Sequence, residues 1–180
     1  MESNRQTIAY EILPLRSFTQ AELWPLLTGY ETHEIYAVEK TEAEQRTQFD
    51  IRLVRLAKPY QTDYYADFPP EEIERYLGLL TQGYSFGAYQ QGRLVGFAIG
   101  EGFPDERLLL VWEFHVLAEF RRAGICRALM GQVIAKAQQD RIAMVVLETQ
   151  NTNVNAIRFY RAMGFSLEAI DLFLYFHLST

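Results

Sequence analysis

Two spacings of apolar residues predict where the chain forms strands and helices. Apolar residues that alternate with polar ones, or that form short unbroken runs, predict strands over residues 7–13, 34–39, 49–56, 84–89, 93–100, 108–117, 143–147 and 171–177, with one more around Phe165. Apolar residues spaced by three and four predict helices over residues 71–80, 125–140 and 153–163. A short helix is predicted after Thr19, because Thr19 and Glu22 have capping-box spacing and Pro25 limits the helix length.

Turn residues indicate how these elements connect. The polar residues 40–45 would join two early strands into one hairpin, and Gln90-Gln91-Gly92 would join two later strands into another. Strand–helix–strand units follow in the second half of the chain. This order predicts a mixed α/β (α+β) fold, and a length of 180 residues with 49% hydrophobic content fits a single domain over residues 1–180.

Composition and charge narrow the functional classes. A formal charge of −6 argues against nucleic-acid binding and is compatible with a cationic small-molecule partner. The single cysteine, Cys126, excludes an intrachain disulfide, and His33, His115 and His177 lack the spacing of metal ligands, so no metal is expected. No apolar run approaches the roughly 20 residues of a membrane span, and no secretory signal is visible. We therefore expect a cytoplasmic protein with no membrane partner.

The most informative stretch is Arg121-Arg122-Ala123-Gly124-Ile125-Cys126-Arg127, which ends an apolar strand and begins a helix. The first N–H groups of a helix have no intrahelical partner, and the helix dipole favours an anion there. Three arginines at this end reverse the usual preference for acidic residues. Two interpretations stay open: the arginines reach acidic neighbours on the surface, or the turn binds a phosphate group. The glycine and the strand–turn–helix context favour the phosphate site.

Two motifs resemble the GNAT superfamily of acetyl-CoA-dependent N-acetyltransferases. The first, similar to the family's phosphate loop, is Arg121-x-x-Gly124-x-Cys126, and the second is Asn153-x-x-Ala156-x-x-Phe159-Tyr160-x-x-x-Gly164-Phe165. They occur in the family's order, with a helix and a strand of suitable length between them. The resemblance covers about residues 84–177. It implies the GNAT-like acyl-CoA N-acyltransferase fold, a central mixed sheet with helices on both faces, here with an extra N-terminal hairpin.

A finer resemblance is to the streptothricin acetyltransferases and their uncharacterised relatives. It rests on Leu147-Glu148-Thr149-Gln150, Asn153, Phe159-Tyr160, Gly164-Phe165 and Asp171-x-x-Leu174-Tyr175. Upstream, an early hairpin and a tyrosine-rich acidic connector at residues 63–68 are similar in plan to that branch.

The resemblance implies acetyl-CoA as co-substrate and assigns its contacts. The backbone of Phe114, His115 and Val116 would pair with the pantetheine arm. The pyrophosphate would be held by the loop residues Arg121, Arg122, Ala123, Gly124, Ile125, Cys126 and Arg127, and Asn153 and Tyr160 would also contact the cofactor. Cys126 stands where the family has Gly or Ala, and as the next smallest apolar residue it is expected to preserve binding. A packing role for Cys126 is favoured over a nucleophilic one, although a helix N-terminus can activate a thiol.

The resemblance also implies direct acetyl transfer to an amine, with Tyr160 as the general acid towards the CoA sulfur. The other interpretation of Tyr160 is a core residue on an amphipathic helix. Glu113, in the apolar run 108–117, and Glu148, at the end of the next strand, compete for the role of general base. Both are expected to be buried, a setting that favours proton uptake near neutral pH. We favour Glu113, and expect His115 on the same strand face to pack or hydrogen-bond.

The acceptor would enter beside the early hairpin and the acidic connector, whose lining suits a cationic amine. The predicted function is therefore N-acetylation of a small cationic molecule such as a streptothricin-type antibiotic. One alternative is a protein N-terminus or lysine as acceptor, and another is a non-catalytic acyl-CoA-binding module. The sequence is compatible with a monomer or a homodimer.

Overall fold

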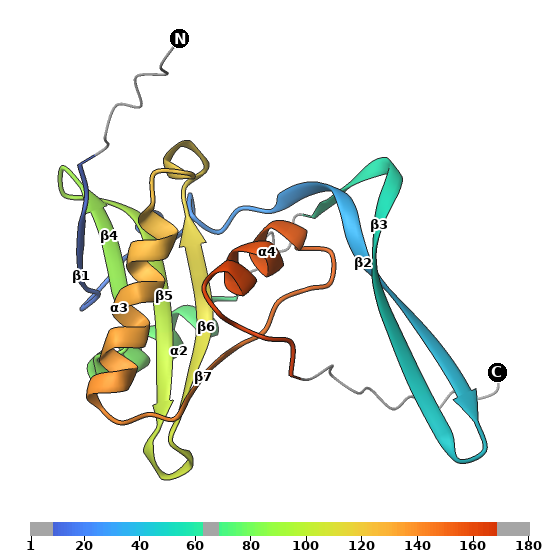
Figure 1. The fold of residues 1–180 in the computed structure, drawn as a ribbon. Coiled ribbons are helices and arrows are strands. Elements are labelled where there is room, and N and C mark those ends of the chain that lie inside the picture. Colours follow the sequence, from blue (N-terminus) through green and yellow to red (C-terminus); the bar gives the residue numbers. More distant parts are fainter. Residues whose placement is uncertain (1–8, 63–68, 169–180) are drawn as a thin grey trace.

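The computed structural model describes residues 9–62 and 69–168, and its central feature is a five-stranded mixed sheet (Figure 1). The strands are β1 (Glu11–Pro14), β4 (Phe86–Gln90), β5 (Arg93–Phe103), β6 (Leu108–Val116) and β7 (Met144–Leu147), in the order β1-β4-β5-β6-β7. The pairs β1–β4, β4–β5 and β5–β6 are antiparallel, whereas the pair β6–β7 is parallel. The predicted mixed sheet is thus confirmed.

Helices cover both faces of this sheet. In Figure 1, α3 (Ile125–Gln139) lies in front of the sheet and α2 (Pro70–Leu79) lies behind it. The helix α4 (Val154–Ala162) lies between the sheet and the early hairpin. The one-turn helix α1 (Gln20–Leu23) begins with the predicted capping box, in which Thr19 and Glu22 each accept a hydrogen bond from the other's backbone N–H.

The early hairpin is longer than the sequence predicts. It consists of β2 (Tyr30–Ala43) and β3 (Arg46–Thr62), which form a separate two-stranded sheet with pairing that continues to Ala43 and Arg46. The predicted hairpin is confirmed, but residues 40–43 belong to β2, so the connecting turn consists of Glu44 and Gln45 alone. These strands extend away from the core (Figure 1). Backbone pairing and cross-strand ion pairs such as Arg52 with Glu39 hold them together.

The end of α4 explains a second difference. A strand was expected around Phe165, but the described residues there form no strand. Gly164 adopts a left-handed φ of 97°, and the N–H of Phe165 donates back to the carbonyl of Tyr160 at 3.0 Å. Phe165 thus belongs to the glycine-containing C-cap of α4, which satisfies a carbonyl that the helix leaves open. The predicted strand at 171–177, the start of the strand at 7–13 and the connector at 63–68 lie outside the described residues.

The core is formed where α3 packs on β5 and β6. Phe97, Ile99, Leu109, Leu129 and Met130 are all fully buried. The predicted buried strand at 143–147 differs, because Met144 is exposed and the rest of β7 is half-buried at the edge of the described sheet. None of the helices in the described part of the chain has the length and apolar content of a membrane span.

We expect Leu129→Ala to lower the free energy of unfolding by about 2–5 kcal/mol, because it removes a buried side chain and leaves a cavity. Leu53→Ala is the matched control, since Leu53 is 41% exposed on the hairpin and should change stability by less than about 1 kcal/mol. Urea unfolding followed by circular dichroism measures both. Equal losses for the two variants would contradict this assignment of the core.

Candidate active site

The turn between β6 and α3 has the geometry of an anion site. Gly124 adopts a left-handed φ of 87° immediately before the helix begins at Ile125, a conformation that favours glycine. Ala128 donates the first helical hydrogen bond, to the Gly124 carbonyl at 3.0 Å, so the amides of Ile125, Cys126 and Arg127 lie at the open end of the helix. The strand–turn–helix arrangement predicted here is confirmed.

The arginines of this turn have few partners within the protein. Arg121 donates from Nε to the carbonyl of Val116 at 3.4 Å, which directs it along the end of β6. Across residues 9–62 and 69–168, neither Arg121, Arg122 nor Arg127 forms an ion pair with a carboxylate. The interpretation that they neutralise acidic neighbours is therefore not supported in the described part of the chain. Their charge, which no carboxylate of the described residues pairs with, lies at the positive end of α3 and favours an anion.

Strand β7 pairs with only the first part of β6. The parallel register joins Leu108–Val111 to Met144–Leu147 and ends there, whereas β6 continues to Val116. Beyond Val111, the edge of β6 that carries Phe114, His115 and Val116 no longer faces β7. This edge of β6 lies beside the turn before α3. An extended ligand can add to the edge in the way that a further strand would.

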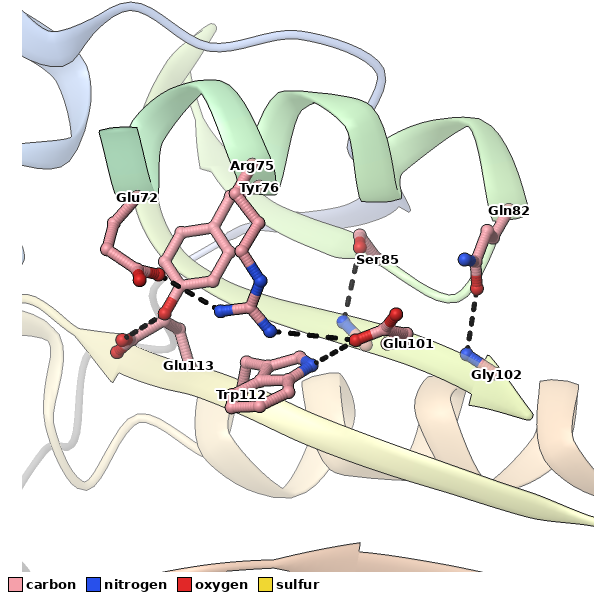
Figure 2. Close-up of polar contacts among 10 residues, drawn as sticks. Glu72, Arg75, Tyr76, Gln82, Ser85, Glu101, Gly102, Trp112 and Glu113 are labelled. Carbon is pink, nitrogen blue, oxygen red and sulfur yellow. Dashed lines mark hydrogen bonds and ion pairs between the residues drawn. The ribbon is translucent and has the colours of Figure 1, made fainter. Parts of the chain in front are cut away.

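An irregularity in β6 decides where its side chains point. Ile99 lies opposite Glu113 and Gly100 lies opposite Val111, so Trp112 has no partner across the ladder and forms a β-bulge. In a regular strand consecutive side chains point to opposite faces, but a bulge allows two in a row to share one. Trp112 and Glu113 both contact α2 in this way (Figure 2).

Tyr76 and His115 both contact the Glu113 carboxylate on the α2 face of the sheet. The Tyr76 hydroxyl donates to Oε1 of Glu113 at 2.9 Å (Figure 2), and Nε2 of His115 lies 2.7 Å from Oε2. The Glu113 side chain is only 11% exposed, and His115 packs against the ring of Phe97. The predicted burial of Glu113 is confirmed, as is the hydrogen-bonding role expected of His115.

Tyr160 lies near the opposite face of β6. Its ring packs with those of Phe114, Phe159 and Phe165, at centroid distances between 5.4 and 6.2 Å. Burial raises the pKa of the Tyr160 phenol above its usual range, and the nearby Cys126 and Glu113 raise it further. The phenol therefore keeps its proton at neutral pH and can donate it.

Three other predicted residues have less central places. Glu148 follows β7 and is exposed, so the expectation of a buried carboxylate there is wrong, because the half-buried edge strand leaves its end in solvent. The side-chain oxygen of Asn153 accepts a hydrogen bond from the N–H of Ala156 at 3.2 Å and thus caps α4. Cys126 is half-buried in the first turn of α3.

No sequence motif indicated Tyr76, Arg75 or Trp112 as site residues. The Arg75 guanidinium lies 3.8 Å above the Trp112 ring and forms ion pairs with Glu72 and Glu101. Trp112 donates from Nε1 to Glu101 at 2.7 Å. Helix α2 is distant from β6 in the sequence, and the contacts depend on a β-bulge that the apolar pattern of β6 did not predict.

Comparison with known proteins decides the family. A model of the acetyltransferase (GNAT) family matches residues 31–165. The chain belongs to this family. The prediction from its two motifs is confirmed, and so is the similarity to streptothricin acetyltransferases: one from Escherichia coli is 28% identical over 139 residues, which cover 72% of this chain and 74% of the relative.

Two further acetyltransferases are similar to this chain. The crystal structure of nourseothricin acetyltransferase matches with a TM-score of 0.66 and 27% identity, covering 88% of this chain and 84% of that one. Ribosomal protein bS18-alanine N-acetyltransferase from Escherichia coli (strain K12) is 30% identical over 99 residues, or 55% of this chain. That match spans 61% of the relative's own length.

We expect the Cys126 thiol to react slowly with Ellman's reagent in the folded protein. Burial raises the pKa of this thiol, although the positive charge of Arg121 opposes the shift, and a protonated thiol is a poor nucleophile. Because Cys126 is the only cysteine, the absorbance at neutral pH reports it alone. The urea-unfolded protein is the control and should react at the rate of a free cysteine. Equally fast labelling of the folded protein would contradict the packing role.

Proposed function

We propose that this protein is an acetyl-CoA-dependent N-acetyltransferase that acetylates an amine of a small cationic molecule of the streptothricin type. The observation that carries the proposal is the Glu113 carboxylate, whose side chain is only 11% exposed, in the part of β6 that extends beyond β7. Family membership supports the reaction class, and the streptothricin and nourseothricin acetyltransferases support the class of acceptor.

The residues of the phosphate turn fit acetyl-CoA. The amides of Ile125, Cys126 and Arg127 at the open end of α3, with Arg121 and Arg122 beside them, would hold the pyrophosphate. The backbone of Phe114, His115 and Val116 would pair with the pantetheine arm, and Ala123 and Gly124 would allow close approach to the turn. Bound there, the cofactor supplies a thioester as the acetyl donor.

Glu113 and Tyr160 have separate roles in direct transfer. Glu113, with His115 beside it, accepts a proton from the acceptor ammonium, so that the neutral amine can attack the thioester carbonyl. Tyr160 donates its proton to the departing sulfur, since its raised pKa keeps the phenol protonated. Glu113 lies in the part of β6 that extends beyond β7, and Tyr160 of α4 packs against Phe114 in the same part, each associated with a different face of the sheet.

A second acceptor class has an observation in its favour. The relative that is 30% identical over 99 residues is an alanine N-acetyltransferase of a ribosomal protein. A peptide N-terminus is therefore the competing acceptor, and it needs the same proton transfers at Glu113 and Tyr160.

Thiol release from acetyl-CoA, measured across streptothricin, aminoglycosides, polyamines and peptides, tests the proposal. We expect turnover with streptothricin or another cationic small molecule and at least about tenfold lower kcat/KM with peptides. Turnover with peptides alone would transfer the function to protein modification. Acetyl-CoA binding without turnover on any acceptor would contradict the enzymatic proposal and favour the non-catalytic module.

The roles of the two carboxylates and of the tyrosine are tested with the best acceptor from that panel. We expect Glu113→Gln and Tyr160→Phe each to lower kcat by about 10²–10⁴-fold, because each removes a proton-transfer group. Glu148→Gln is the matched control and should retain kcat within about threefold, since Glu148 is exposed. A large loss in Glu148→Gln with little loss in Glu113→Gln would assign the base to Glu148.

A further inference from the structure

Tyr76 is a buried residue of α2 with a polar contact to the proposed base. It is 4% exposed, and its hydroxyl donates to Oε1 of Glu113 at 2.9 Å. Burial, followed by the negative charge of Glu113, raises the pKa of the Tyr76 phenol well above its usual range. The phenol therefore keeps its proton and is the donor in its hydrogen bond to Glu113.

The two oxygens of the Glu113 carboxylate have different partners. Oε1 accepts from Tyr76, whereas Oε2 lies 2.7 Å from Nε2 of His115. A carboxylate oxygen has two lone pairs, so Oε2 can accept a further proton while His115 is beside it. The Tyr76 contact thus fixes the rotation of the carboxylate and distinguishes one oxygen from the other.

The position of Tyr76 depends on the residue before it. Arg75 stacks on Trp112 and forms ion pairs with Glu72 at 3.0 Å and with Glu101 at 3.6 Å. Two consecutive residues of α2 therefore contact two consecutive residues of β6, Arg75 with Trp112 and Tyr76 with Glu113 (Figure 2). Only a bulged strand can present both partners to the same helix. This double contact fixes the position of α2 relative to β6.

We infer that Tyr76 is a positioning residue: it holds Oε1 of Glu113, so that Oε2, next to His115, receives the proton of the acceptor ammonium. In this step an N–H bond of the ammonium breaks, an O–H bond forms at Oε2, and Tyr76 keeps its own proton. The inference rests on the proposed function, because it needs Glu113 as the base. In the described residues, the charged and titratable groups around the pair are Glu72 and Arg75 from α2, Glu101 from β5, His115 from β6 and Tyr160 from α4.

The test is the pH dependence of kcat/KM in Tyr76→Phe. Loss of a donor to the ionised carboxylate makes its protonation easier, so the acidic limb should move to higher pH by about one unit. We also expect kcat at pH 7 to fall about tenfold, with KM for acetyl-CoA within about twofold of the wild-type value. An unchanged acidic limb in a folded Tyr76→Phe variant would overturn the inference.

Tyr84→Phe is the matched control. Tyr84 is also buried, at 8% exposure, and its hydroxyl interacts with Asp140 at the end of α3, away from Glu113. It should lose stability as Tyr76→Phe does, but keep the wild-type pH profile. A matching shift of the acidic limb in the control would assign the effect to general loosening of the protein and so overturn the positioning role.

A second variant covers the case in which Tyr76→Phe does not fold. Replacing Tyr76 with 3-fluorotyrosine keeps the size of the side chain nearly unchanged and makes the phenol a stronger donor. The acidic limb should then move to lower pH, opposite to the shift in Tyr76→Phe. A limb that does not move with the fluorinated residue would contradict the inference.

Failure of the proposed function can be recognised separately. If Glu113→Gln keeps full activity, or if the wild type acetylates no acceptor, the base assignment or the function is wrong. In that event, ¹³C NMR titration of the Glu113 carboxyl group in wild type and in the Tyr76 variants measures the positioning directly. A midpoint that rises in Tyr76→Phe and falls with 3-fluorotyrosine supports the contact's effect on the carboxylate, whereas equal midpoints overturn it.

Discussion

The β-bulge at Trp112 is the constraint on which the proposed active site depends. Because β6 gains one unpaired residue against β5, Trp112 and Glu113 both face α2, and regular alternation then returns His115 to that face. Phe114 points the other way and packs with Phe159 and Tyr160. A single extra residue in one strand thus separates a carboxylate–imidazole pair on one face from an aromatic cluster with a phenol on the other.

The end of pairing between β6 and β7 complements this bulge. The parallel ladder stops at Val111, immediately before Trp112, so the strand that carries Glu113 leaves its neighbour where its side chains change direction. The same strand ends at Val116, whose carbonyl accepts from Arg121 of the phosphate turn. The nine residues of β6 therefore contain both the end of its pairing with β7 and Glu113, and the strand leads directly to the turn before α3.

Polar contacts attach the early hairpin to the body of the protein. Tyr30 donates to Gln150, and Arg158 pairs with Glu34, both at 2.7 Å. The backbone N–H of Tyr36 donates to the carbonyl of Asn151 at 2.9 Å. Gln150 and Asn151 lie in the segment that joins β7 to α4, and Arg158 lies on α4 itself. The hairpin is therefore attached to the same part of the chain that carries Tyr160.

Local sequence determined the elements whose signals are themselves local. The capping box at Thr19, the left-handed glycines at 124 and 164, and the spacing of three and four in α3 all depend on residues within a few positions of one another. The motifs around Gly124 and Tyr160 likewise predicted the family and the phosphate turn. The sequence predicted buried positions for both Glu113 and Glu148, and only the tertiary structure distinguished the largely covered Glu113 side chain from the exposed Glu148, because burial depends on which neighbours cover a strand end. The tertiary structure also decided the contact of Tyr76 with Glu113, since these residues meet only when α2 packs on a bulged strand 37 positions away in the sequence.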